Sequence, residues 1–286
     1  MDCFLITTNH LSDGLWFRDD EDFKTGMNYV ALVVNRTGVR MLAFILMSNH
    51  VHFMLECHKK EAEEFVNNFK RRYSQYYSSK YGSKKLLRRN PIDIRKIPGE
   101  QEALERAIAY VQMNCVAANI CLSPVQYPWG SGTCFFSASE GNGVKAKCLS
   151  AEAKRRITHS HDIIPEHYIF NDDYILPSSY IEIEFVERLF RTPKRMQYFL
   201  MNSSKAKAAL AIAEAHMPSF RDQSILAVIP DLCRSLFSTD SPSLLSDRSK
   251  SILLKEIKRR FCADISQICR VMGMERVEVI NLLDTV

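Results

Sequence analysis

The sequence predicts an α+β protein, with a ferredoxin-like (split βαβ) antiparallel sheet that carries helices, followed by an all-α C-terminal extension. Three observations lead to this fold class. Within residues 1–120 the periodic segments follow one another as strand, helix, two strands, helix, basic stretch and helix. The strand-like segments are apolar runs or two-residue alternations. From Tyr180 onward the periodicity is helical and is interrupted at prolines.

Each element of the sheet region has its own signal. Apolar or alternating residues predict strands, and apolar residues at helical spacing predict helices. The expected strands are 3–8, 40–47 and 50–57, and the expected helices are 20–35, 61–81 and 100–120. Strand 40–47 is apolar throughout and should therefore be central. The basic stretch 82–99 contains Gly and Pro and permits a further short strand.

The character of the chain changes after Trp129. Residues 130–147 are small and polar, which is typical of a domain edge. We therefore expect three parts: a domain at 1–132, a linker or irregular extension at 133–179, and a helical C-terminal domain at 180–286.

The end of the helical domain has a helix-turn-helix outline. A basic amphipathic helix at 243–261 precedes the capping box Asp264-Ile-Ser-Gln267, and Gly273 separates a short helix from the final one. The final helix, ERVEVINLLD, carries three acidic residues and one Arg, which is unfavourable for an element facing phosphates. Base reading and a packing or dimerisation role both stay open.

Composition excludes several classes of protein. The 286 residues are 46% hydrophobic and 25% charged, as in soluble globular proteins. No apolar run approaches the ~20 residues of a membrane span, and the N-terminus MDCFLITT lacks the basic flank of a signal peptide. We expect a cytoplasmic protein without a membrane partner. The nine cysteines form no C-x-x-C pair, so we expect them to be reduced and structural.

Positive charge is concentrated in one segment. Residues 59–96 contain twelve Lys or Arg and four acidic residues, whereas residues 1–58 contain four basic and seven acidic ones. Such a segment is expected in a protein that binds a polyanion, although a merely solvated face would have the same composition.

Two short motifs carry the chemistry. In His50-Val51-His52 the period of a strand puts both imidazoles on one face, roughly 7 Å apart at the backbone. They can close on one cation or be two polar side chains on a solvated face. In the helix 100–120, Tyr110 and Asn114 are four residues apart and share a face. Together these residues offer two nitrogen ligands, an amide oxygen and a hydroxyl nucleophile.

These motifs carry a family resemblance over residues 1–132. NHVHFML is similar to the His-hydrophobe-His signature of HUH endonucleases, and FILMSNHVHFMLE resembles the single-tyrosine transposases. Within that group the chain most resembles the REP-associated tyrosine transposases. Tyr110-Val-Gln-Met-Asn114 resembles their nucleophile helix, and Tyr127-Pro-Trp-Gly-Ser131 resembles their aromatic-Pro-Trp-Ser element. Two positions depart from the pattern: Cys115 replaces a proline, and Thr8-Asn9-His10 replaces an Arg-Gly.

The resemblance implies cleavage and rejoining of single-stranded DNA beside a hairpin, through a 5′-phosphotyrosine. Tyr110 would be the nucleophile, and His50, His52 and Asn114 would hold Mg²⁺ or Mn²⁺. Because a phosphodiester anion repels nucleophiles, a cation must polarise it, and the phenol, with a pKa of about 10, must lose its proton. Hairpin DNA is the expected partner, and a homodimer is possible. The expected DNA contacts in the basic segment are Lys70, Arg71, Arg72, Lys84, Lys85, Arg88 and Arg89.

Two rival interpretations remain. A non-catalytic nucleic-acid-binding or regulatory protein could have kept the fold, but it would have no need of His50, His52, Tyr110 and Asn114 together. A zinc-dependent hydrolase would need an acidic third ligand and a Glu base at a useful spacing, which the sequence lacks. The second His-x-His, at His159 and His161, lies in a polar stretch and is interpreted as an exposed loop.

Overall fold

A computed structural model describes residues 1–8, 15–82, 91–137, 143–171, 173–203, 220, 222–261 and 263–284. The first strands and helices form a βαββαβ unit whose sheet has the order β2-β3-β1-β4, with all neighbours antiparallel. This order confirms the predicted ferredoxin-like fold class. The strands are β1 (Asp2–Thr8), β2 (Arg40–Met47), β3 (His50–Cys57) and β4 (Ile92–Ile97).

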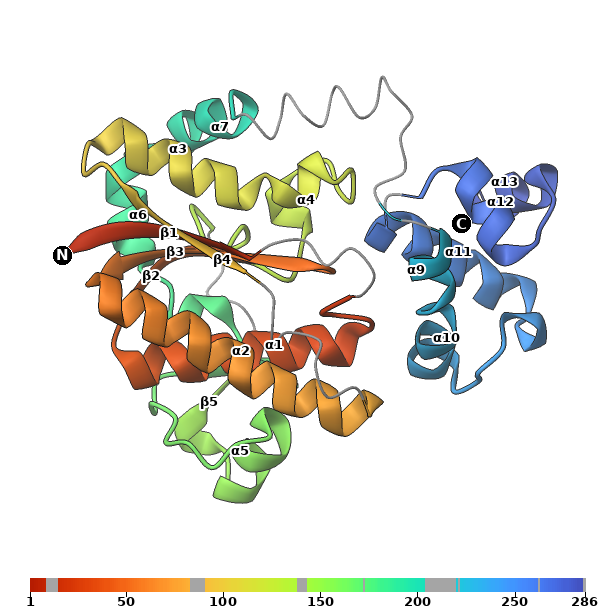
Figure 1. Ribbon diagram of the computed structural model, residues 1–286, viewed down its shortest axis with the longest axis horizontal. Helices are drawn as coiled ribbons and strands as arrows, with labels where there is room; N and C mark the ends of the chain where they lie inside the picture. Colours follow the sequence, from red (N-terminus) through yellow and green to blue (C-terminus); the bar gives the residue numbers. More distant parts are fainter. Residues whose placement is uncertain are drawn as a thin grey trace.

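Helices cover both faces of this sheet (Figure 1). One face carries α1 (Asp20–Thr37) and α2 (Lys59–Tyr81), and the other carries α3 (Gln101–Gln112). Successive side chains of β3 point to opposite faces of the sheet, one toward α2 and the next toward α3. The Phe53 ring lies 5.1 Å from the Phe65 ring of α2, whereas the ring of the preceding residue, His52, lies 5.6 Å from the Tyr110 ring of α3.

The helix predicted at 100–120 is interrupted. It continues after α3 only as the four-residue α4 (Asn114–Ala117), and Met113 lies at the junction. The Asn114 amide donates hydrogen bonds to the carbonyl oxygens of Tyr110 and Val111, at 2.9 and 3.1 Å. An asparagine side chain that bonds its own helix in this way competes with the regular backbone pattern. Asn114 is therefore at a helix junction one turn beyond Tyr110.

The predicted irregular extension has its own structure. It contains a three-stranded sheet of β5 (Val144–Lys145), β6 (Ile169–Asn171) and β7 (Tyr174–Ile175), and the helix α5 (Ala151–Thr158). The helices α6 (Ile183–Phe190) and α7 (Pro193–Met201) follow, within the part predicted as the helical domain. Short 3₁₀ turns lie at Pro124–Gln126, Ala146–Cys148, Pro177–Ser179 and Pro242–Leu244. Val186, Phe190, Met196 and Phe199 of α6 and α7 are buried in the same hydrophobic core as the main sheet.

A second hydrophobic core gathers the C-terminal helices. These are α9 (Asp222–Leu226), α10 (Ile229–Phe237), α11 (Asp247–Phe261), α12 (Ile265–Met272) and α13 (Arg276–Asp284). Asp264 caps α12 by accepting from the Gln267 N–H, and Gly273 ends it with φ of +64°, as expected of a helix-turn-helix outline. Since α6 and α7 belong to the first core, Phe220 is the first residue after them, among those described, that packs on the second core. The domain boundaries at 132 and 179 stay predictions.

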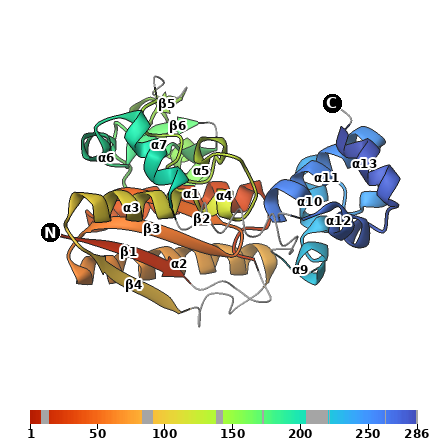
Figure 2. The same cartoon turned by 90° about the horizontal axis from the view of Figure 1, so that it is seen from above.

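The helical unit is docked at one end of the sheet. In both views the C-terminal helices lie beyond the sheet end opposite the N-terminus (Figures 1 and 2). Arg18 bonds Asp231 at 2.8 Å and the Ala227 carbonyl at 2.7 Å, and Arg260 bonds Asp20 at 2.5 Å. Leu15 inserts into the second core. Within the described residues, no helix is long and apolar enough to cross a membrane.

The packing between β3 and α2 makes a first testable prediction. Phe53 is fully buried between Phe65 and Phe69, so Phe53→Ala should lower the free energy of unfolding by about 3–5 kcal/mol. Urea unfolding followed by tryptophan fluorescence measures this change, because Trp16 and Trp129 both lie in the first core. Val125→Ala, at an exposed position, should change it by less than about 0.5 kcal/mol. Equal effects of the two substitutions would contradict the assigned packing.

Candidate active site

The two histidines of β3 lie side by side at the start of the strand. His52 pairs with Thr7 of β1 and Ile45 of β2, and His50 pairs with Met47 of β2. Their rings are 4.8 Å apart at 89°. His50 is 4% and His52 1% exposed, so they are not polar side chains on a solvated face. The sequence left that choice open, and the structure places both imidazoles in the layer between the sheet and α3.

Neighbouring polar groups orient the two rings. His50 Nδ1 lies 2.8 Å from Asn49 Oδ1, and His52 Nδ1 lies 3.0 Å from Thr7 Oγ1. Because an amide oxygen can only accept, the His50 Nδ1 is the donor in this contact, and in the neutral imidazole Nε2 would then be the nitrogen that can bind a cation. The Thr7 hydroxyl can accept in the same way from His52. Metal-binding imidazoles are held by hydrogen bonds of this kind on their second nitrogen.

Tyr110 lies against His52, one member of this pair. Its ring meets the His52 ring edge-on at 90°, with 5.6 Å between the centroids, and it is only partly buried. Burial raises the pKa of the Tyr110 phenol, the positive charge of Arg95 lowers it, and Asp93 raises it. Because burial is the largest of these effects, the phenol is neutral at pH 7 and must lose its proton as it attacks, and Arg95 only partly offsets this cost.

Arg95 and Asp93 are site residues that the sequence analysis missed. In the sheet register, Thr7 is opposite both His52 and Asp93, and directly opposed residues of antiparallel strands share a face. Arg95, two residues further along the edge strand β4, is on that face and pairs with Asp93 at 3.3 Å. The alternation of Ile92 and Ile94 with these charged residues could have predicted a strand with both charges on one face. It could not have predicted that this strand pairs with β1.

Asn114 supplies the amide of the predicted set. It is buried, and its Nδ2 is engaged by the carbonyls of its own helix, which leaves Oδ1 as the atom with metal-ligand chemistry. Its closeness to the imidazoles stays a prediction. In the part of the chain that the structure describes, no group of three or more His, Cys, Asp or Glu could hold a metal ion. Two imidazoles and an amide oxygen fit a cation whose remaining ligands are phosphate oxygens and water.

The Tyr127–Ser131 element has a structural role. Leu46 N donates to Trp129 O at 2.8 Å and Ser131 N donates to Phe44 O at 3.0 Å, so the element runs along the edge of β2. A Cβ at Gly130 would lie 2.9 Å from Phe44 O, which is too close for a side chain. The buried Tyr127 hydroxyl donates to Leu46 O at 2.8 Å, and burial raises its pKa well above the usual value. Tyr127 is thus a poor competitor for the role of nucleophile.

The basic residues of α2 lie on the face of the sheet opposite Tyr110. Arg72 is 15% exposed and bonds Asp162 of the extension at 2.5 Å. Arg71 bonds Asn68 on its own helix, and burial lowers the pKa of Lys70. Their contact with DNA stays a prediction. The remaining four expected contacts, Lys84, Lys85, Arg88 and Arg89, lie outside the described residues.

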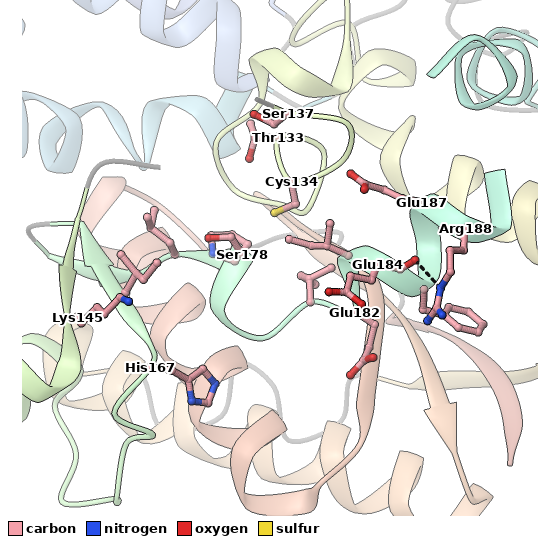
Figure 3. A pocket seen from close by; sticks show the side chains of 16 residues that line it. Thr133, Cys134, Ser137, Lys145, His167, Ser178, Glu182, Glu184, Glu187 and Arg188 are labelled. Atoms are coloured by element: carbon pink, nitrogen blue, oxygen red, sulfur yellow. Dashed lines mark hydrogen bonds between the residues drawn. The ribbon is translucent and has the colours of Figure 1, made fainter. Parts of the chain in front are cut away.

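A cavity of about 840 Å³ lies elsewhere, where the extension meets α6 (Figure 3). Glu182, Glu184 and Arg188 line one side of it, and Lys145 and His167 line the other. Glu182 N donates to Met41 O at the start of β2, whereas His50 pairs with Met47 at the end of that strand. The cavity is therefore at the other end of β2 from the candidate site.

The second His-x-His is not part of either site. His159 ends α5 with φ of +51°, and both His159 and His161 are exposed. This confirms its interpretation as an exposed loop.

Comparison with known families supports a transposase. Residues 17–90 match the family model described as "Transposase IS200 like". The matched segment includes both histidines of β3 and ends before Tyr110. Neither the curated proteins nor the solved structures that were compared with the chain include a match.

The matched segment, residues 17–90, contains the paired histidines and the strands β2 and β3 of the antiparallel sheet, so this part of the chain is similar to IS200-like transposases. The match supports the transposase family for residues 17–90 and does not distinguish the REP-associated subtype.

Proposed function

We propose that this protein is a metal-dependent single-stranded DNA endonuclease and strand transferase of the REP-associated tyrosine type. One observation carries the proposal: the Tyr110 ring packs on His52, whose ring lies 4.8 Å from that of His50. The match of residues 17–90 to IS200-like transposases supports a DNA substrate. A hydroxyl nucleophile beside two oriented imidazoles suits transfer of a phosphodiester.

The chemistry assigned to Tyr110 is a two-step transfer. Its Oη attacks the phosphorus and gives up the phenolic proton to solvent, the bond from phosphorus to the 3′ oxygen breaks, and that oxygen takes up a proton from solvent. One fragment keeps a free 3′ hydroxyl and the other is joined to Tyr110 through its 5′ phosphate. In the second step a 3′ hydroxyl attacks this phosphotyrosine and displaces Tyr110, so the bond energy is kept for resealing. Mg²⁺ or Mn²⁺ held by His50, His52 and Asn114 would polarise the phosphate oxygen.

The charges around Tyr110 predict how the rate depends on pH. Because burial raises its pKa, the phenolate is scarce at neutral pH, and adduct formation should rise about tenfold per pH unit below that pKa. Arg95→Gln should move the rise to higher pH, and Asp93→Asn should move it to lower pH. The measurement is the single-turnover rate of adduct formation against pH at saturating DNA. Identical profiles in both variants and the wild type would contradict a role of these charges at Tyr110.

A direct assay separates this function from its main rival. The protein is incubated with hairpin-bearing single-stranded DNA and Mg²⁺ or Mn²⁺, and the products are separated on a denaturing gel. A covalent protein–DNA adduct supports the enzyme. Retention of DNA on a native gel without any adduct supports the non-catalytic nucleic-acid-binding protein instead.

A further inference from the structure

The charge of the C-terminal helical unit is divided between its helices. Residues 222–284 contain nine basic and nine acidic residues, but α11 alone contains six basic and two acidic ones. The other helices and their loops are therefore net acidic. In α13, the helix that would read bases in a helix-turn-helix, Arg276 and Glu278 are both exposed, and Asp284 ends the helix. The element of this unit suited to a polyanion is α11.

Three of the six cations of α11 are on its outer side. Arg248, Lys255 and Lys258 are exposed, and Ile252 among them is 44% exposed. We refer to these four residues as the α11 stripe. The opposite side of the helix is buried in the second core through Leu253, Leu254, Ile257 and Phe261. Ten residues of helix span about 15 Å, so the stripe is an elongated ridge of cations.

One end of α11 is fixed beside the candidate active site. Arg260, 5% exposed, bonds Asp20 at the start of α1 and Glu256 on its own helix, and lies over the Phe23 ring. Its carbonyl accepts a hydrogen bond from Ser48 Oγ at 3.5 Å. Ser48 is two residues before His50. The buried end of α11 thus meets the loop that leads into the paired histidines, and the stripe extends away from it.

We propose that the α11 stripe binds the phosphate backbone of single-stranded DNA that flanks the cleavage site. This inference rests on the proposed function, because it takes the strand at Tyr110 as its starting point. Three exposed cations along a ridge can each neutralise a phosphate, while the acidic remainder of the unit repels the strand from its other faces. Phosphate contacts of this kind position a strand without reading its sequence.

The test compares the full-length wild type with Arg248→Ala/Lys255→Ala/Lys258→Ala. For single strands log affinity falls with log salt at roughly 0.7 per neutralised phosphate, so the triple variant should lower that slope by about two units. The effect should appear with a hairpin that carries a single-stranded flank and disappear with the bare hairpin. The matched control, Arg155→Ala/Arg156→Ala/Lys194→Ala, removes three exposed cations from α5 and α7 and should leave the slope unchanged.

Three results would overturn the inference. They are an unchanged slope in the α11 variant, an equal decrease in the control, and an equal decrease with and without the flank. Circular dichroism checks that both variants are folded, and Lys255→Arg/Lys258→Arg should keep the wild-type slope.

The covalent adduct, measured in the same samples, keeps this inference separate from the proposed function. A wild-type adduct together with an unchanged slope in the α11 variant overturns the inference alone. A lowered slope without any wild-type adduct supports the binding surface and overturns the proposed enzyme.

Discussion

Tyr110→Phe is expected to abolish the covalent protein–DNA adduct while DNA affinity stays within about twofold of the wild type. Only the hydroxyl is lost, so the ring can keep its packing on His52. Removing the nucleophile of a covalent mechanism should lower the rate by at least about 10³-fold. Denaturing gels measure the adduct, and fluorescence anisotropy measures the affinity.

Tyr127→Phe is the matched control for this experiment. It removes a buried hydroxyl that donates to Leu46 O, so it should cost about 1 kcal/mol of stability and leave adduct formation intact. An adduct that survives in Tyr110→Phe and disappears in Tyr127→Phe would assign the nucleophile to Tyr127 and contradict the proposed site.

The second large effect concerns the imidazoles. His50→Ala and His52→Ala should each lower the rate of adduct formation by more than about 100-fold, because each removes a nitrogen ligand of the proposed Mg²⁺ or Mn²⁺. Asn49→Ala removes only the group that bonds His50 Nδ1, and a loss of roughly 10–100-fold is expected. Adduct formation at increasing Mn²⁺ concentrations measures these losses together with the affinity for the metal.

His161→Ala provides the control for a general loss of histidine. This side chain is exposed in the loop after α5 and should not affect the reaction. Wild-type activity in His52→Ala, or a wild-type reaction that continues in EDTA, would exclude the metal-dependent mechanism.

The sequence predicted those features of the fold that depend on neighbouring residues in the chain, such as the two faces of a strand. The alternation in β3 predicted that His52 and Phe53 take opposite faces, and they contact α3 and α2 respectively. The end of α1 is also local, because Gly38 follows that helix with φ of +68°, where glycine is favoured. These features depend on residues close together in the chain.

Features set by long-range contacts were not accessible in this way. The register between β1 and β4 brings Arg95 to the face of Tyr110, and no pattern within either segment fixes that register. In the same way, α6 and α7 have the periodicity of the C-terminal helices but pack on the first core. The charge run at 59–96 showed a basic segment, but not that Arg72 would be engaged by Asp162.

The central claim is that Tyr110 becomes covalently joined to a 5′ phosphate of DNA. The most direct measurement is mass spectrometry of the trypsin- and nuclease-treated product formed by the wild type with hairpin-bearing single-stranded DNA and Mn²⁺. We predict that the peptide containing Tyr110 gains the mass of a 5′-phosphorylated nucleotide, with fragment ions that place it on Tyr110. A modified peptide that lacks Tyr110, or cleaved DNA without any modified peptide, would contradict the claim.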